Sequence, residues 1–121
     1  MTKTQNTKTY DLEDRTLEFA RQVRDFVRKL NRTIGNIEDG KQLIRSSGSI
    51  GANYIEANEA LSKKDFVMRV KICRKEAKES RYWLKLVNID GKKELEQERT
   101  GLENEACELT HIFGAIVTKS E

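Results

Sequence analysis

The chain has 121 residues, a length that suits one domain able to bury about two-thirds of the surface that its unfolded form exposes. It has no proline, 36% charged residues and a formal net charge of +3, a composition that favours long helices with solvated outer faces over strands. No apolar run approaches the roughly 18 residues that cross a bilayer, and the polar first ten residues lack a signal-peptide core, so we expect one cytoplasmic domain over residues 1–121.

The first predicted helix spans about residues 12–34 and ends near Gly35. Apolar residues recur along it at helical spacing, which predicts one buried side. They are Leu12, Phe19, Val23, Phe26, Val27, Leu30 and Ile34. Arginines recur on another side of the same helix, and we call them the first basic row: Arg21, Arg24, Arg28 and Arg32.

The second predicted helix spans about residues 37–60 and is opened by Asn36, or one turn later by Asp39 with Gly40. Its main apolar stripe steps by four and three residues in turn, which keeps one side facing a partner helix. The stripe consists of Leu43, Ser47, Ile50, Tyr54, Ala57 and Leu61.

A second small or apolar face accompanies that stripe, formed by Ile44, Gly48, Gly51, Ile55 and Asn58. A glycine inside a helix costs up to about 1 kcal/mol relative to alanine, so two glycines near each other predict close approach by another helix. That helix could be the first or fourth helix of the same chain, or it could belong to another subunit. Because a second apolar face on a small bundle commonly meets another chain, the predicted oligomer interface is Ile44, Gly48, Gly51 and Ile55.

The third predicted helix spans about residues 63–87, and Ser62 with Asp65 fits a capping box at its start. Its apolar stripe contains Phe66, Val70, Cys73, Ala77, Ser80, Leu84 and Val87. Roughly 60–140° around the helix from that stripe, at about 100° per residue, lies a second basic row. The second basic row is Lys71, Arg74, Lys78, Arg81 and Lys85.

The fourth predicted helix spans about residues 92–118 and follows the turn residues 88–91. Its apolar positions are Leu95, Leu102, Ala106, Leu109, Phe113 and Ile116. Helices of about 20 to 25 residues joined by short turns lie antiparallel to their sequence neighbours. The sequence therefore predicts an all-α, up-down-up-down antiparallel four-helix bundle.

Charge is distributed unevenly along the chain. Residues 63–85 contain nine Lys or Arg and three Asp or Glu, whereas residues 88–121 contain four and eight. Two basic rows facing solvent could follow a phosphate backbone, with binding that weakens as salt rises because counterions are released. The alternatives are a merely solvated face, or pairing with the acidic fourth helix of a neighbouring subunit.

Some polar and aromatic residues are expected to have packing roles. Arg45 on the second helix is placed to contact Glu76 or Glu79 on the third, which would fix the register of the two helices. Tyr82 and Trp83 could offer stacking to bases, but Trp83 lies toward the apolar side, so we expect it to be buried between helices or subunits.

No catalytic, cofactor or metal site is predicted. The single histidine, His111, has no constellation of carboxylates and thiols around it, and Glu108 with His111 gives only one copy of the Glu-x-x-His motif that di-metal bundles repeat on two helices. Cys73 and Cys107 have no metal-ligand spacing and are expected to be reduced thiols. Glycine-rich phosphate loops are also missing from the sequence.

The sequence closely resembles a family of bacterial four-helix-bundle proteins, first noticed in intervening sequences of large-subunit ribosomal RNA genes and often labelled ribosomal-protein-like. The resemblance covers about residues 10–117. It rests on residues 42–57, which contain the pattern R-S-S/A-x-S-I/V-x-A-N-x-x-E at Arg45 to Glu56, and on residues 62–66 and 75–84.

That resemblance implies a four-helix bundle assembled as a homo-oligomeric ring of five subunits, with no known catalysis. A distant branch, the accessory variability protein of diversity-generating retroelements, is a basic pentameric barrel that binds nucleic acid and associates with a reverse transcriptase. The acidic fourth helix of this chain departs from that uniformly basic pattern.

These observations together predict a non-enzymatic homo-oligomer, without a cofactor, that binds structured RNA or DNA through its first and third helices. The competing hypothesis is a protein-interaction scaffold that recruits a polypeptide partner, in which the basic rows serve subunit pairing. Neither hypothesis involves a membrane.

Overall fold

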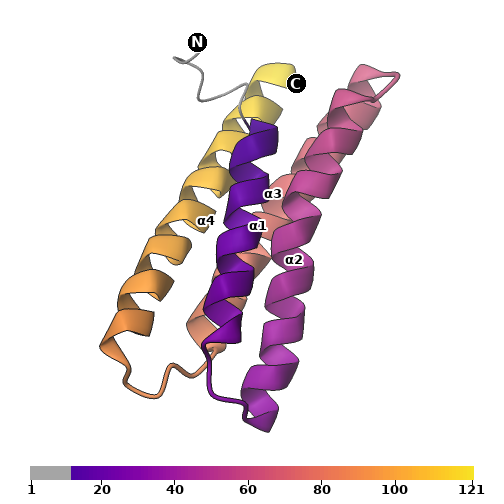
Figure 1. The fold of residues 1–121 in the computed structure, drawn as a ribbon. Coiled ribbons are helices and arrows are strands. Elements are labelled where there is room, and N and C mark those ends of the chain that lie inside the picture. Colours follow the sequence, from indigo (N-terminus) through magenta and orange to yellow (C-terminus); the bar gives the residue numbers. More distant parts are fainter. Residues whose placement is uncertain (1–11) are drawn as a thin grey trace, which may run out of the picture.

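The computed structural model describes residues 12–121, which form four packed helices and no strand. The helices are α1 (Leu12–Arg28), α2 (Ile34–Asn58), α3 (Lys63–Leu86) and α4 (Lys93–Ser120). Helix α2 packs against α1 and α3, and α4 packs against α3 and α1, whereas α1 and α3 are not adjacent to each other. The helices α1 and α3 therefore occupy diagonally opposite corners of the fold (Figure 1).

The connections lie at the two ends of an elongated molecule (Figure 1). Those between α1 and α2 and between α3 and α4 are at one end, and the α2–α3 connection is at the other, together with the end of α4. The prediction of an all-α fold with four helices is confirmed. In addition, no helix of residues 12–121 is both long enough and apolar enough to cross a membrane.

The boundary between α1 and α2 differs from the prediction. Helix α1 ends at Arg28, not near residue 34, and Thr33 caps α2, its side chain accepting a hydrogen bond from the Asn36 backbone N–H at 3.1 Å. The predicted opening at Asn36 or Asp39 is wrong, because the hydroxyl of Thr33 already satisfies a free N–H of the first turn. Ile34, expected on the buried side of the first helix, is 84% exposed at the start of α2.

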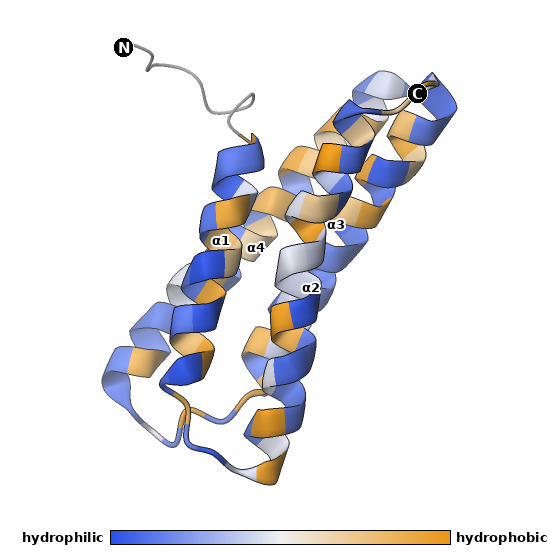
Figure 2. Cartoon of the chain, turned by 45° about the vertical axis from the view of Figure 1, so that its right-hand side comes forward, coloured by the Kyte–Doolittle hydropathy of each residue, from blue (hydrophilic) through white to orange (hydrophobic). Residues whose placement is uncertain are grey.

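The start of α3 is as predicted, since Ser62 is the N-cap and its hydroxyl accepts a hydrogen bond from the Asp65 backbone N–H at 3.0 Å. Leu61 does not continue the α2 stripe, because α2 ends at Asn58 and Leu61 lies fully exposed in the connection. The predicted apolar stripes are otherwise the core. In Figure 2 each helix shows apolar and polar segments in turn, as expected of helices with one buried side.

The core is built around large, fully buried side chains from all four helices. Each such apolar side chain stabilises the fold by about 1.5–3 kcal/mol through burial. The largest are Phe19, Phe26, Phe113, Leu12, Leu43, Ile50, Leu84 and Leu109. Between α2 and α3 the core also holds a polar contact, the hydroxyls of Ser46 and Ser80 at 2.9 Å. Small residues at these positions allow the two helices to pack closely.

One buried amide joins both connections at the same end of the fold. The side-chain nitrogen of Asn36 donates to the carbonyl oxygens of Asn31 at 3.0 Å and Asn88 at 2.9 Å. Its side-chain oxygen accepts from the Asn88 backbone N–H at 2.9 Å. The α1–α2 and α3–α4 connections are thereby tied together through one side chain that is only 5% exposed.

The two cysteines differ in burial, which gives a first testable prediction. Cys73 lies in the core, where its thiol donates to the Ile50 carbonyl at 3.4 Å and burial raises its pKa to about 12. Cys107 is partly exposed. Since the thiolate is the reactive form, we expect one thiol per folded chain to react with a disulfide reagent at pH 8, and both to react in denaturant.

A Cys107→Ser variant isolates the buried thiol. Its remaining thiol should react more than about 100-fold more slowly in the folded chain than in denaturant, because reaction needs opening of the core. Rapid labelling of folded Cys107→Ser would contradict the burial of Cys73.

Candidate nucleic-acid interface

The first basic row lies partly on α1 and partly beyond it. Arg21 and Arg24 line a groove of about 420 Å³ between α1 and α2. The guanidinium of Arg24 also donates to the Ala20 carbonyl at 3.1 Å, and that of Arg28 pairs with Asp25 at 3.0 Å. Arg32 lies in the α1–α2 connection, so its predicted place on the first helix is wrong.

The second basic row lies entirely on α3, and its members have different environments. Lys71 pairs with Glu121 at the end of α4, at 3.3 Å, and the aliphatic part of Arg74 lies beside Gly114 of α4. Lys78, Arg81 and Lys85 are exposed and form no ion pair with any carboxylate of residues 12–121. These three cations are thus available to an external anion.

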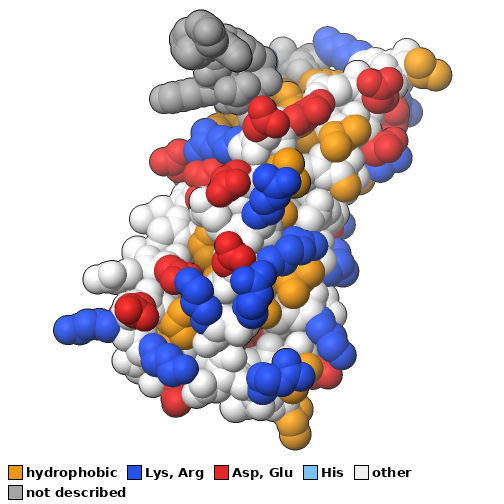
Figure 3. All heavy atoms as spheres, in the orientation of Figure 1, with side chains coloured by type: hydrophobic (Ala, Val, Ile, Leu, Met, Phe, Trp, Pro, Cys, Tyr) orange, Lys and Arg blue, Asp and Glu red, His pale blue; other side chains and the backbone are white. Residues whose placement is uncertain are grey.

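The two basic rows do not form one continuous surface on a single chain. Helices α1 and α3 are not adjacent, and the rows face different neighbours: Arg24 lies toward α2, whereas Lys71 and Arg74 lie toward α4. Figure 3 shows the α1/α2 face, where Lys and Arg side chains predominate in the lower half, with apolar side chains between them. A single phosphate backbone therefore cannot follow both rows of one chain along one face.

Two carboxylates of α3, those of Glu76 and Glu79, are directed toward α2 and away from the second basic row. Glu79 pairs with Arg45 at 2.9 Å, and Glu76 lies 3.4 Å from the same guanidinium, which confirms the predicted contact between the two helices. Burial raises the pKa of Glu76. Burial acts in the same direction on Glu79, but the hydrogen bonds from Arg45 and Trp83 together with the charge of Arg45 outweigh it and lower the pKa of Glu79. Because Arg45 engages these acids, they form no ion pair with Lys78 or Lys85, which pair with no carboxylate of residues 12–121.

Two members of this α3 surface were not among the predicted site residues. Tyr82 is 57% exposed, and it follows Lys78 by four residues and precedes Lys85 by three, so it lies on the same side of the helix. Lys75 is exposed as well. Helical spacing from Lys78 was a sufficient signal for both. The structure also places Trp83 partly inside the fold, on the apolar side where the sequence put it, and leaves Tyr82 outside the core.

The glycine face of α2 meets α1 of the same chain. A Cβ atom at Gly51 would lie 2.8 Å from the hydroxyl oxygen of Thr16, and one at Gly48 would lie 3.5 Å from the Arg24 guanidinium. The sequence left open whether the approaching helix belongs to the same chain or to another subunit. At Gly51 it is α1 of the same chain. Ile44 is partly buried, and Ile55 remains 49% exposed beside the α1/α2 groove.

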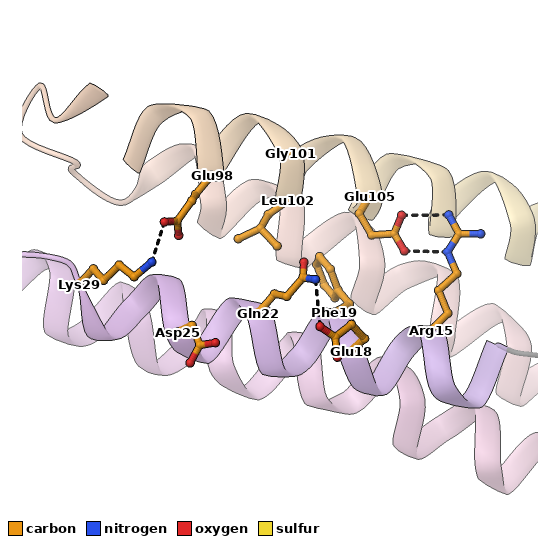
Figure 4. Close-up of a pocket in the computed structure, with 10 residues that line it drawn as sticks. All are labelled: Arg15, Glu18, Phe19, Gln22, Asp25, Lys29, Glu98, Gly101, Leu102 and Glu105. Carbon is orange, nitrogen blue, oxygen red and sulfur yellow. Dashed lines mark hydrogen bonds and ion pairs between the residues drawn. The ribbon is translucent and has the colours of Figure 1, made fainter. Parts of the chain in front are cut away.

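A second groove separates α1 from α4 (Figure 4). Its volume is about 590 Å³, and ion pairs close it at both ends. Arg15 contacts both Glu105 oxygens at 2.7 and 2.9 Å, and Lys29 contacts Glu98 at 2.6 Å. These hydrogen bonds raise the pKa of Arg15 and of Lys29 and keep both side chains charged.

The charge of this α1/α4 groove makes it unsuitable for a polyanion. Four carboxylates line it against two cations, and both cations are already paired. The carboxylates are Glu18, Asp25, Glu98 and Glu105. We therefore place the candidate interface on α3.

Comparison with known proteins agrees with the motif in α2 and α3. The sequence model of the family described as 23S rRNA-intervening sequence protein matches residues 8–114. The chain belongs to this family. It is also similar to a crystal structure of a protein of unknown function from the S23 ribosomal protein family of Bacteroides thetaiotaomicron VPI-5482. The two sequences are 31% identical over 87% of this chain and 96% of the other, with a TM-score of 0.73. No match is found among curated proteins.

In this member of the 23S rRNA-intervening sequence protein family, the residues of the pattern Arg45 to Glu56 make mainly packing contacts. Arg45 pairs with Glu79, Ser46 contacts Ser80, and the Asn53 side-chain oxygen accepts a hydrogen bond from Arg69 at 3.1 Å. All three contacts join α2 to α3. The recognised pattern therefore fixes how these two helices pack, and the candidate interface lies on the outer side of α3.

No metal site is assembled in the described part of this family member. Among residues 12–121, no group of three or more His, Cys, Asp and Glu side chains is close enough together to hold a metal ion. His111 is exposed on α4.

Proposed function

We propose that this chain is an up-down-up-down four-helix bundle that assembles into a non-enzymatic, cytoplasmic homo-oligomer, a ring of five copies, and binds structured RNA. The observation that carries the proposal is the set of three exposed cations on α3 that pair with no carboxylate of residues 12–121 (Lys78, Arg81 and Lys85). Phosphate groups are the anions that such a surface binds in exchange for released counterions. The family description, which refers to 23S rRNA, is consistent with RNA as the partner.

Assembly strengthens the electrostatic argument. Five copies at +3 each carry roughly +15, presented as repeated patches that hold a polyanion better than one copy does. The α1/α2 groove supports the assembly, because Leu17 and Ile55 are each 49% exposed beside it. Helix–helix contact between copies would bury this apolar surface. Ile44 and Gly48 belong to the same proposed interface.

A triple substitution tests the RNA-binding surface. In Lys78→Gln/Arg81→Gln/Lys85→Gln, three phosphate contacts are lost, so we expect the slope of log affinity against log salt for an RNA stem-loop to become shallower by about 2 to 3. Fluorescence anisotropy at several salt concentrations measures the slope. Light scattering, with one chain at 14.0 kDa, establishes that the variant assembles like the parent chain.

The matched control is Arg21→Gln/Arg28→Gln/Arg32→Gln in the first basic row, which removes the same charge from another face. We expect this control to change the slope by less than half as much. Equal losses in both variants would show an effect of net charge and contradict an α3 site. If the α3 variant loses assembly instead, the cations serve subunit pairing, as the scaffold hypothesis requires. No binding by the parent chain at low salt would reject RNA binding.

A further inference from the structure

Tyr82 is an exposed aromatic ring among the exposed cations Lys78, Arg81 and Lys85 of α3. It is 57% exposed, whereas Phe19, Phe26 and Phe113 are fully buried. Lys78 and Lys85 lie one helical turn before and after it, and Arg81 is its neighbour in sequence. The ring therefore stands within a surface whose charges attract phosphate.

The Tyr82 ring has a defined position on this surface. It packs edge-on against Trp83, with ring centroids 5.0 Å apart and an angle of 77° between the ring planes. Trp83 is held in turn, since its indole N–H donates to Glu79 at 3.3 Å and Glu79 pairs with Arg45 of α2 at 2.9 Å. This chain of contacts orders the aromatic pair before any ligand arrives, which lowers the entropic cost of stacking on it.

We propose that Tyr82 is a stacking platform for an unpaired base, and that Lys78, Arg81 and Lys85 bind the adjoining phosphates, so that α3 binds a single-stranded segment of RNA. This inference rests on the proposed RNA-binding function and specifies its substrate. An aromatic ring stacks on any base that is free to leave its neighbours, as in loops, bulges and ends. In a duplex the bases are already stacked on each other, and only the phosphates remain accessible to the cations.

The spacing of the cations fits a short segment. Lys85 is seven positions after Lys78, which corresponds to about 10 Å along the helix axis, and Tyr82 lies between them. Phosphates on both sides of one stacked nucleotide can therefore reach a cation at the same time. The carboxylates nearest in sequence, Glu76 and Glu79, are engaged with Arg45 and lie on the α2 side.

The test compares Tyr82→Leu with Tyr82→Phe, since leucine keeps apolar bulk without a π face and phenylalanine keeps the ring. The probes are a single-stranded RNA of about 12 nucleotides and a blunt duplex of the same sequence, within the range of known site sizes. We expect Tyr82→Leu to weaken single-strand binding by about 5- to 150-fold, while Tyr82→Phe stays within about 3-fold of the parent chain. Duplex affinity should be the same for all three.

The salt dependence of RNA binding distinguishes a loss of stacking on Tyr82 from a loss of the cationic surface as a whole. Neither substitution removes a charge, so the slope of log affinity against log salt should not change in Tyr82→Leu. If Tyr82→Leu binds the single strand as tightly as the parent chain, while Lys78→Gln/Arg81→Gln/Lys85→Gln does not, the stacking role is wrong and the proposed function stands. If the parent chain binds neither probe at low salt, both are wrong.

Discussion

Gly51→Ala is expected to destabilise the folded chain by about 2 kcal/mol, although alanine is the better helix former. The added Cβ would lie 2.8 Å from the Thr16 hydroxyl oxygen and 3.3 Å from the Thr16 Cβ. Thr16 is fully buried, and its hydroxyl already donates to the Leu12 carbonyl at 2.7 Å, so it cannot rotate away without losing that bond. Overpacking typically costs 1–3 kcal/mol, which exceeds the propensity gain of up to about 1 kcal/mol.

Gly101→Ala is the matched control for this prediction. Gly101 is exposed within α4, and a Cβ there would meet no atom within 4 Å. The propensity term then acts alone, and we expect Gly101→Ala to stabilise the chain by about 0.5–1 kcal/mol. Urea unfolding followed by circular dichroism measures both changes. The opposite signs distinguish steric overlap from a general effect of replacing glycine.

A double variant assigns the cost to one contact. Thr16→Ala removes the 2.8 Å contact, so Gly51→Ala should destabilise the Thr16→Ala variant less than it destabilises the parent chain, with a coupling of at least about 0.5 kcal/mol. If Gly51→Ala is as stable as the parent chain, α1 does not approach α2 at this position. Light scattering on the same variants shows whether the assembly changes as well.

Much of the fold could be predicted because apolar spacing is strong on α2 and α3. Residues such as Leu43, Ile50, Val70 and Leu84 recur with the period of a helix and are fully buried. Ser62 also marks its helix start correctly, because a small hydroxyl residue followed by an acid is a local signal that needs no tertiary contact.

The α1–α2 boundary could not be predicted from the same kind of signal. Leu30 is buried although it lies beyond the end of α1, so the apolar pattern continues across the break and Ile34 extends it by coincidence. The segment contains no proline that would mark the boundary. The cap that decides it is Thr33, whose hydroxyl binds the Asn36 N–H. Because α1 ends early, Arg32 lies in the connection, whereas the other members of the first basic row lie on α1.

The candidate site could be predicted in composition but not in arrangement. Helical spacing identifies the members of the second basic row, but only the fold shows that Lys71 meets Glu121 while Lys78 and Lys85 meet no carboxylate of residues 12–121. The pair of Lys71 with Glu121 joins positions far apart in the chain, which helical spacing cannot reveal. The diagonal placement of α1 and α3 likewise follows from packing, and it places the two basic rows on different faces.

Asn36→Ala is expected to destabilise the chain by about 2–4 kcal/mol, a large effect for one polar residue. The substitution removes two hydrogen bonds to the Asn31 and Asn88 carbonyls and a third from the Asn88 N–H. Each of these groups is partly or wholly withdrawn from water, and an unsatisfied buried polar group costs about 1–3 kcal/mol. The α1–α2 and α3–α4 connections are then no longer joined through the side chain of residue 36.

Asn31→Ala is the matched control, because it makes the same chemical change on an exposed residue. The Asn31 side chain contacts Asp90 and Lys92 at the surface, at 2.8 and 2.9 Å, and its backbone carbonyl is kept in the variant. We expect a loss below about 1 kcal/mol, since water replaces exposed hydrogen bonds. Thermal unfolding should show a fall in Tm for Asn36→Ala several-fold larger than for Asn31→Ala.

Asn36→Asp separates the donor role of this side chain from its acceptor role. Aspartate still accepts from the Asn88 N–H, but when ionised it cannot donate and places negative charge against two carbonyl oxygens. At neutral pH it should therefore be at least as destabilising as alanine. Equal stability of Asn36→Asp and the parent chain would show that the two donated bonds contribute nothing, and that the acceptor alone holds the connections together.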